Sequence, residues 1–164
     1  MKKPSFTEEN GLENPLRRIQ SIADYQFGEG AGEILFPQDV TIEYSHNTGR
    51  IRYITLDGER IATLRPTDGL LSLSVKAAEA IAKKAPSAPC YIMVQQDVAG
   101  FIAKGGDVFA AHVVKAAPEI HAKDEVIVQD EKGRVLAVGR AFLSSAEMLS
   151  FKTGVAVKVR HGSG

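Results

Sequence analysis

The sequence predicts an α+β protein of two parts: an N-terminal antiparallel sheet with two helices, followed by a C-terminal β pseudo-barrel. Three observations predict this class. Apolar residues recur at helical spacing after Asn14-Pro15, they alternate with period two from Asp39, and a proline-containing segment then precedes five or six further short strands. The expected divisions are a disordered tail at residues 1–13, an α+β domain at 14–85, a proline spacer at 86–89 and a pseudo-barrel domain at 90–164.

The N-terminal domain carries clear start and stop signals. The Asn14 side chain can cap a helix whose first position is Pro15, and Gly28 ends that helix. The alternating residues that follow predict strands, two of which are joined by a hairpin turn at Asp57-Gly58. Ser74 begins a second helix, whose apolar face is expected to contain Val75, Ala78, Ile81 and Ala85.

The glycines from Gly28 to Gly32 permit two interpretations. They could form a nucleotide-binding loop, but the dinucleotide-binding motif follows a strand and opens a helix, whereas these glycines follow a helix. We therefore expect a structural turn.

The C-terminal domain is expected to begin with a strand at residues 90–95. Asp97 then caps a short helix that ends at Gly105, with Val98, Phe101 and Ile102 directed inward. Ser144 and Glu147 have the spacing of a capping box for a further short helix. The remaining expected strands span residues 108–115, 124–129, 134–143 and 155–160.

The last of these strands has one apolar and one cationic face. Val155, Val157 and Val159 alternate with Ala156, Lys158 and Arg160, and successive side chains of a strand point to opposite faces. We expect a strand that packs on a core and presents a basic surface.

Composition bounds the function only loosely. The chain has 20 Lys and Arg against 20 Asp and Glu, so its overall charge does not indicate nucleic acid binding. Cys90 is the single cysteine, which excludes an intrachain disulfide and favours a reducing, cytoplasmic setting. We find no secretory signal in MKKPSFTEENG and no apolar run of membrane-spanning length, so we expect no membrane partner.

Several motifs occur in order in the C-terminal domain: FIAKGGDVFAAHVV, DEVIVQDEKGRVLAVGRA and GVAVKVR. Together they resemble the PUA domain, a small RNA-binding pseudo-barrel, and in particular the PUA domain that ends archaeal archaeosine tRNA-guanine transglycosylases. The segment DYQFGEGAG followed by LFP resembles the domain that precedes the PUA domain in those enzymes. The resemblance implies RNA, and tRNA above all, as the partner.

The resemblance also implies which residues contact RNA, because the short helix and the strand after it form much of the PUA groove, and the strand of Gly139 lies beside the last strand. Two features have simpler explanations: a helix C-cap accounts for Gly105 alone, and isolated cations are usually solvated. The expected RNA-binding residues are Lys104, Gly105, Gly106, Asp107, Val108, Phe109, Lys115, Gly139, Arg140, Lys152, Lys158 and Arg160.

No catalytic or metal-binding pattern accompanies these residues. The four histidines lack metal-ligand spacing to one another or to Cys90, and no serine or cysteine nucleophile has a recognisable base nearby. The catalytic barrel domain of the transglycosylases has no counterpart in the sequence. We therefore expect no cofactor, no metal and no catalytic residue.

These observations predict a non-catalytic RNA-binding protein that binds the acceptor stem and 3′ end of tRNA in support of tRNA modification, together with a separately encoded modifying enzyme. The alternative is a protein-interaction subunit of a tRNA-modifying complex with little RNA affinity of its own, with which the acidic hairpin (Asp124, Glu125, Asp130 and Glu131) is compatible.

Overall fold

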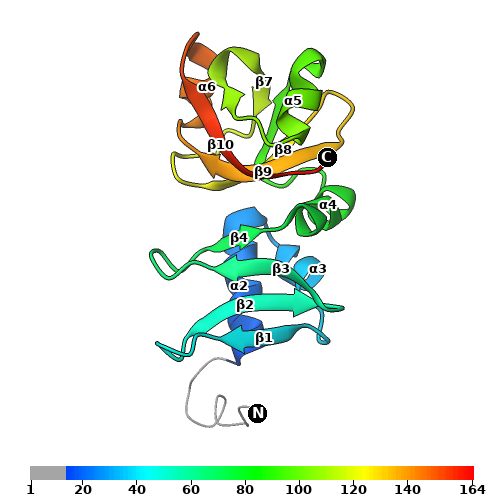
Figure 1. Ribbon diagram of the computed structural model, residues 1–164, viewed down its shortest axis with the longest axis vertical. Helices are drawn as coiled ribbons and strands as arrows, with labels where there is room; N and C mark the ends of the chain where they lie inside the picture. Colours follow the sequence, from blue (N-terminus) through cyan, green and yellow to red (C-terminus); the bar gives the residue numbers. More distant parts are fainter. Residues whose placement is uncertain (1–13) are drawn as a thin grey trace. The chain divides into compact units, whose positions relative to one another are not determined.

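A computed structural model describes residues 14–164, so the tail predicted at residues 1–13 lies outside the described residues. The chain divides into two compact units, Met1–Leu71 and Ser72–Gly164, and each is described by itself. Figure 1 shows a helix-backed sheet in the first unit and a barrel-like sheet in the second.

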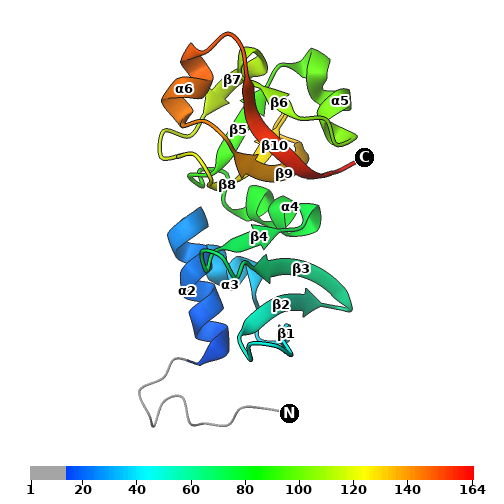
Figure 2. The same ribbon diagram turned by 60° about the vertical axis from the view of Figure 1, so that its left-hand side comes forward.

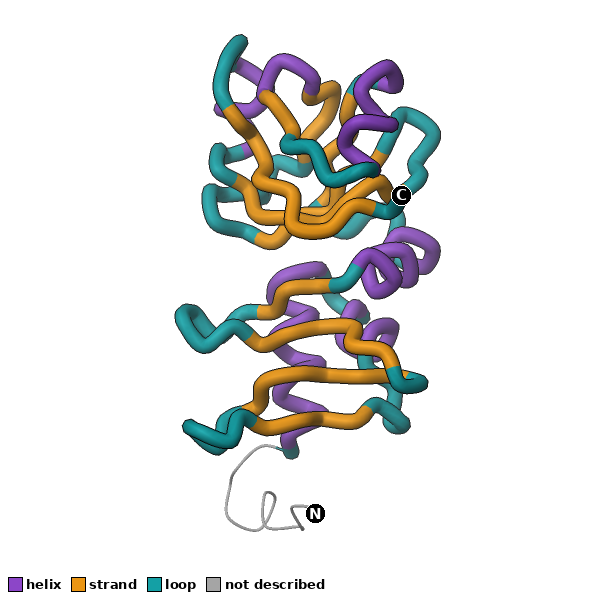
Figure 3. Tube along the Cα trace, in the orientation of Figure 1, coloured by secondary structure: helices purple, strands orange, loops and turns teal. Residues whose placement is uncertain are grey.

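The first unit is an antiparallel sheet with two helices against it. The chain forms α2 (Pro15–Phe27) and α3 (Ala31–Leu35), and then β1 (Thr41–Tyr44), β2 (Ile51–Leu56), β3 (Glu59–Leu64) and β4 (Leu71–Leu73), whose last two residues are counted in the second unit. The strand order is β1-β2-β3-β4, visible in Figure 3 as four successive strands. Figure 2 shows α2 beside one face of this sheet, where it buries Ile19, Ala23 and Phe27.

The predicted start and stop of α2 are confirmed. The Leu16 backbone N–H donates to Asn14 Oδ1 over 2.9 Å, and Gly28 ends the helix with φ 105°. Hydrogen bonding of this kind satisfies a backbone donor that the helix itself leaves without a partner.

The glycine segment after α2 forms the expected structural turn, but it also opens a short helix, α3, that the sequence analysis did not predict. The Gly32 N–H donates to Asp24 Oδ1 over 2.7 Å, and a Cβ on Gly32 would lie 2.3 Å from the Gln20 carbonyl oxygen. Glycine at this position therefore lets α3 lie directly against the backbone of α2, a close packing of helices rather than a ligand loop.

The second unit is a nearly closed, barrel-like sheet. It contains α4 (Val75–Lys84), β5 (Tyr91–Val94), η1 (Gln96–Val98), α5 (Ala99–Ala103), β6 (Val108–Phe109), η2 (Ala110–His112), β7 (Val113–Ala116), β8 (Glu125–Gln129), β9 (Val135–Ala141), α6 (Ser145–Ser150) and β10 (Val155–Gly162). The strand order is β6-β10-β9-β8-β5-β7, in which β5 and β8 are parallel. Its core is apolar and includes Ile92, Val94, Ile102, Val126, Val128 and Met148.

Local signals in this unit are mostly confirmed. The capping box is formed, because the Glu147 N–H donates to Ser144 Oγ and the Ser144 N–H donates to Glu147 Oε1. The single strand predicted at residues 108–115 is instead two strands, β6 and β7, separated by the turn η2.

Two expectations about the short helix were wrong. Its N-cap is Val98, without a side-chain hydrogen bond, because Asp97 already lies inside the preceding turn η1. Phe101 was expected to point inward, yet its side chain is 60% exposed while its neighbour Ile102 is buried. A five-residue helix turns only one narrow face to the core, and Ile102 and Ala99 occupy it.

The division into compact units falls at Leu71, before α4, whose residues contact β9 of the second unit. The proline spacer at residues 86–89 therefore stays a prediction for the domain boundary. Within residues 14–164, no helix combines the length and apolar character needed to span a membrane.

Candidate nucleic-acid interface

The glycine-pair segment, defined as residues 104–109, runs antiparallel to β10 along most of its length. Three hydrogen bonds fix this arrangement: the Gly164 N–H donates to the Ala103 carbonyl (2.8 Å), the Val159 N–H to Asp107 Oδ1 (3.0 Å) and the Ala110 N–H to the Gly154 carbonyl (2.9 Å). The tertiary structure thus brings together two segments that are about fifty residues apart in sequence.

Asp107 holds this pair of segments together. Besides accepting from the Val159 N–H, its carboxylate lies 3.4 Å from Lys158 Nζ. The Lys158 side chain is nevertheless 63% exposed. An exposed ion pair of this length contributes little to stability and leaves the cation accessible to an external anion.

The structure explains why glycine stands at each of positions 105 and 106. Gly105 has φ 106°, a conformation that side-chain-bearing residues rarely adopt, and it directly follows Lys104, the C-cap of α5. Gly106 lies beneath the Phe101 ring, because a Cβ at this position would be 2.1 Å from Phe101 Cε2. The second glycine therefore makes room for an exposed aromatic ring.

Gly139 permits a close approach of β9 and β10. A Cβ on Gly139 would lie 2.3 Å from the Lys158 carbonyl oxygen. The pairing shifts by one residue between Val159 and His161, beside this glycine, which is the local irregularity expected of a β-bulge. A second shift, between Val155 and Val157, buries Ala156 as well, so the simple alternation predicted for this strand is interrupted.

Arg140 and Lys158 are direct cross-strand partners, and both are exposed. Facing residues in an antiparallel pair have their Cβ atoms about 5 Å apart, and like charges at such positions repel. Each cation also has an acidic neighbour, since Glu125 on β8 is the other cross-strand partner of Arg140 and Asp107 pairs with Lys158. Both cations are nevertheless exposed and accessible to an external anion.

Arg160 has a different environment. Its guanidinium forms a bidentate ion pair with Glu125, with Nη1 to Oε1 at 3.0 Å and Nη2 close to Oε2, and Nη2 also donates to the Leu73 carbonyl at 2.7 Å. The Leu73 N–H donates to the same carboxylate, whose side chain is 0% exposed. Arg160 therefore balances a buried charge inside the second unit.

The other predicted residues are distributed unevenly. Lys104 is exposed beside the C-terminal end of β10, and Phe109 is 41% exposed with its ring edge against His112. Val108 is fully buried. Lys152 precedes β10 at its opposite end, and Lys115 lies on β7, which pairs with β5 and not with β10.

One exposed side chain of this surface, Phe101, was not predicted from the sequence. Its ring covers Gly106 and is 60% exposed, close to Lys104 in the chain. An exposed aromatic ring beside cations can stack on an unpaired base. The sequence held a signal, because Phe101 and Ile102 are adjacent in a short helix, where neighbouring side chains point about 100° apart and cannot both face the core directly.

Chemistry elsewhere in the second unit is limited. Burial, and then the charge of Glu125, raise the pKa of the Cys90 thiol to about 12, so it is protonated at neutral pH. Across residues 14–164, no three His, Cys, Asp or Glu side chains are grouped so as to hold a metal ion.

Two protein families match the chain in succession. The patch-forming domain C2 of tRNA-guanine transglycosylase matches residues 17–88, and the PUA domain matches residues 91–163. The tRNA-guanine(15) transglycosylase of Methanothermobacter thermautotrophicus is 42% identical over 147 residues, which are 90% of this chain and 22% of that enzyme. The Pyrococcus furiosus enzyme is 41% identical over 150 residues, 92% of this chain and 25% of that enzyme.

Solved structures show the same fold. A hypothetical protein of Pyrococcus horikoshii superimposes with a TM-score of 0.72 and 26% identity, covering 91% of this chain and 90% of that one. A conserved PUA domain protein of Thermoplasma acidophilum superimposes with a TM-score of 0.63 and 22% identity, covering 98% of this chain and 92% of that one.

The chain spans 22% to 25% of the length of the two enzymes compared. Its two matching regions follow one another in a single order, C2 and then PUA. The chain therefore resembles the C-terminal region of archaeal tRNA-guanine(15) transglycosylases, with a C2 domain followed by a PUA domain.

Proposed function

We propose that this chain is a non-catalytic RNA-binding protein that binds tRNA at the acceptor stem and 3′ end in support of tRNA modification. The observation that carries this proposal is the glycine-pair segment lying along β10, with Lys104 exposed in the segment and Lys158 exposed on β10. The match to the PUA domain and the similarity to tRNA-guanine(15) transglycosylases also support this proposal.

The proposed contact surface consists of Lys104, Arg140 and Lys158, with Phe101 as an aromatic side chain beside them. The three cations would bind phosphates, which supplies affinity and orientation without sequence specificity. Phe101 would stack on an unpaired base next to the stem, so the surface suits a junction between duplex and single strand.

The remaining predicted residues take other roles in this proposal. Asp107, Gly106 and Gly139 shape the surface, and Arg160 positions β10 through Glu125. Lys115, on β7, and Lys152, before β10, stay predicted contacts that would add to the electrostatic attraction of the surface. Catalysis would belong to a separately encoded enzyme that acts on the bound tRNA.

The test is binding of the full chain to a tRNA transcript, with and without its 3′ single-stranded end, across a salt series. We expect binding that weakens with salt and with loss of that end. The paired variant Lys158→Gln with Arg140→Gln should reduce the magnitude of the slope of log K against log salt by about 1.4–1.8, since each lost phosphate contact removes about 0.7–0.9. Lys132→Gln, in the exposed turn between β8 and β9, is the matched control. An unchanged slope in the paired variant would refute this surface.

A protein-interaction subunit is the second candidate. Exposed apolar side chains on and around α6 favour it: Phe142 and Leu149 are each 52% exposed and Phe151 is 46% exposed. If the chain shows no tRNA binding at low salt but retains a protein partner after nuclease treatment, this function replaces the first.

A further inference from the structure

A second cationic site lies wholly within the first unit, where the sequence analysis assigned no function. It is a cavity of about 370 Å³ between α2, the start of β2 and the loop after β3. Four arginines line it, Arg18, Arg50, Arg52 and Arg65, with Asp68 as the single acidic residue of the lining.

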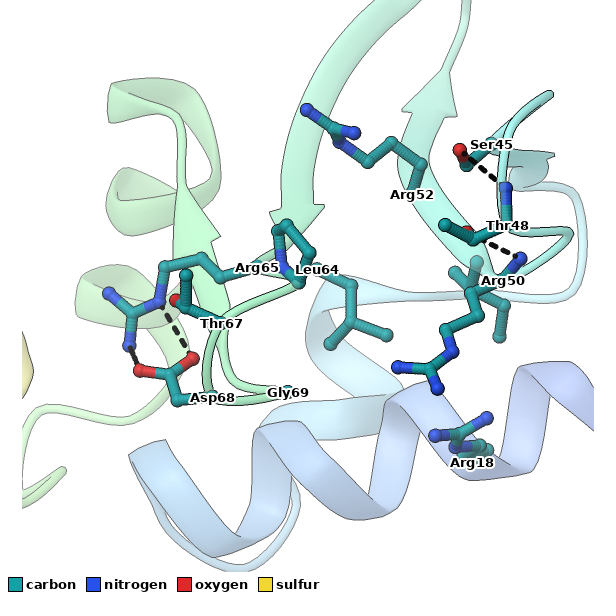
Figure 4. A pocket seen from close by; sticks show the side chains of 12 residues that line it. Arg18, Ser45, Thr48, Arg50, Arg52, Leu64, Arg65, Thr67, Asp68 and Gly69 are labelled. Atoms are coloured by element: carbon teal, nitrogen blue, oxygen red, sulfur yellow. Dashed lines mark hydrogen bonds and ion pairs between the residues drawn. The ribbon is translucent and has the colours of Figure 1, made fainter.

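The charge of this pocket is poorly balanced from within. Asp68 is committed to Arg65, with Nε to Oδ1 at 3.2 Å and Nη2 to Oδ2 at 3.0 Å. Figure 4 shows the side chains of Arg18 and Arg50 pointing toward one another from different elements, with no acidic side chain drawn between them. Two guanidinium groups that converge repel each other unless an anion joins them.

Arg52 adds an unmet hydrogen-bond donor. Its Nε is buried and has no hydrogen-bond partner among residues 14–164. Buried donors in native proteins are almost always satisfied, by protein groups, by water or by a ligand. Figure 4 shows the Arg52 guanidinium directed away from Arg18 and Arg50, so Arg52 offers this donor at a different edge of the pocket.

The chemistry of the lining identifies the ligand class. Guanidinium groups present several fixed N–H donors that match the oxygens of a phosphate group. The apolar lining residues are Ile51, Leu64 and Pro66, which form no aromatic platform for a base. The pocket therefore suits the phosphate and offers little to a nucleoside.

We propose that this arginine pocket binds phosphates of the RNA backbone and gives the bound tRNA a second contact, outside the PUA domain. The inference builds on the proposed function, because it needs RNA as the partner. A phosphodiester backbone fits better than a mononucleotide, since the donors come from separate elements and nothing in the lining recognises a base.

The experiment compares tRNA binding by the wild-type chain and by the double variant Arg18→Gln with Arg50→Gln. Both side chains are exposed, so the fold should tolerate the change. Loss of two phosphate contacts should weaken binding about 15- to 30-fold at 0.15 M salt and reduce the magnitude of the salt slope by about 1.4–1.8. Arg17→Gln, an exposed neighbour on the same helix that does not line the pocket, is the matched control and should bind like wild type.

A second variant separates binding from stability. Thr67 is exposed at the edge of the pocket, so Thr67→Glu would place a carboxylate near the arginines. It should leave the melting temperature unchanged or raise it, while weakening tRNA binding by the same order as the double variant. If Thr67→Glu binds tRNA like wild type, the pocket holds no phosphate of the RNA.

The outcomes distinguish this inference from the proposed function. Normal binding by Arg18→Gln/Arg50→Gln, with weakened binding by Lys158→Gln, would overturn the arginine pocket and leave the PUA surface intact. Absence of binding by the wild-type chain would overturn both. If inorganic pyrophosphate shifts the Arg52 Nε–H resonance in an NMR titration and tRNA does not displace it, the pocket serves a small phosphate compound instead.

Discussion

The ion pair of Arg160 with Glu125 makes the sharpest prediction, because it decides whether Arg160 supports the fold or contacts RNA. In Arg160→Met the buried carboxylate would lose both guanidinium donors, and the Leu73 carbonyl would lose the donor that Arg160 supplies. Breaking a buried ion pair costs about 3–5 kcal/mol. We expect a loss near 3 kcal/mol, since the Arg160 side chain is 32% exposed and part of the pair is solvated.

The measurement is the free energy of unfolding from urea denaturation, for a complete double-mutant cycle. Glu125→Gln removes the other partner, and Glu125→Gln with Arg160→Met removes both. The double variant should lose clearly less than the sum of the single variants, because no charge is then left buried without its partner. The salt slope of tRNA binding by folded Arg160→Met should match that of wild type.

Two results would refute this reasoning. If Arg160→Met lowers the free energy of unfolding by less than about 1 kcal/mol, Glu125 does not depend on this guanidinium. A salt slope reduced by about 0.7–0.9 in a fully folded variant would return Arg160 to the set of phosphate contacts.

Three further predictions concern the second unit. Gly139→Ala should destabilise the protein by about 1–3 kcal/mol, because the added Cβ would meet backbone atoms of β10. Gly106→Ala should cost less, since the exposed Phe101 ring can move aside. The free energies of unfolding from urea denaturation compare the two variants. Cys90, whose pKa is raised to about 12 by burial and by the charge of Glu125, should resist a thiol reagent at pH 8 in the native protein and react only in denaturant. For Asp130, burial raises the pKa, but hydrogen bonds from Arg134, Gln96 and Lys132 outweigh it and leave the pKa lowered. A lowered folded-state pKa gives stability that is present above the unfolded value, near 3.9, and is lost as pH falls through the folded value. Asp130→Asn should therefore cost about 2 kcal/mol at pH 7, with the difference from wild type shrinking in strong acid.

Much of the fold could be predicted because its signals are local. The Asn14-Pro15 helix start and the Ser144–Glu147 capping box involve residues within three positions of each other, and both are formed. Exposure of Lys158 followed from the alternation of β10. The helix α3 was missed because it is five residues long, and its position depends on the packing of Gly32 on Gln20 rather than on a periodic pattern.

The candidate sites depended more heavily on distant residues. Lys158 and Arg160 look equivalent in the sequence, two cations on one strand face, yet only one has a buried carboxylate as its partner. The arginine pocket likewise could not be predicted from the sequence. Arg50 and Arg52 are two residues apart in the chain, but Arg18 comes close to Arg50 only because α2 lies against the sheet.

The sequence by itself determined the element types, the two-part organisation and the resemblance to a PUA domain, because hydrophobic periodicity, caps and turn residues act over a few positions. Only the tertiary structure decided which charges are accessible. Glu125 lies 35 residues from Arg160 in the chain but within hydrogen-bond distance in space. Chain folding sets such pairings, so one cation of β10 becomes the partner of a buried carboxylate while another on the same strand stays largely exposed.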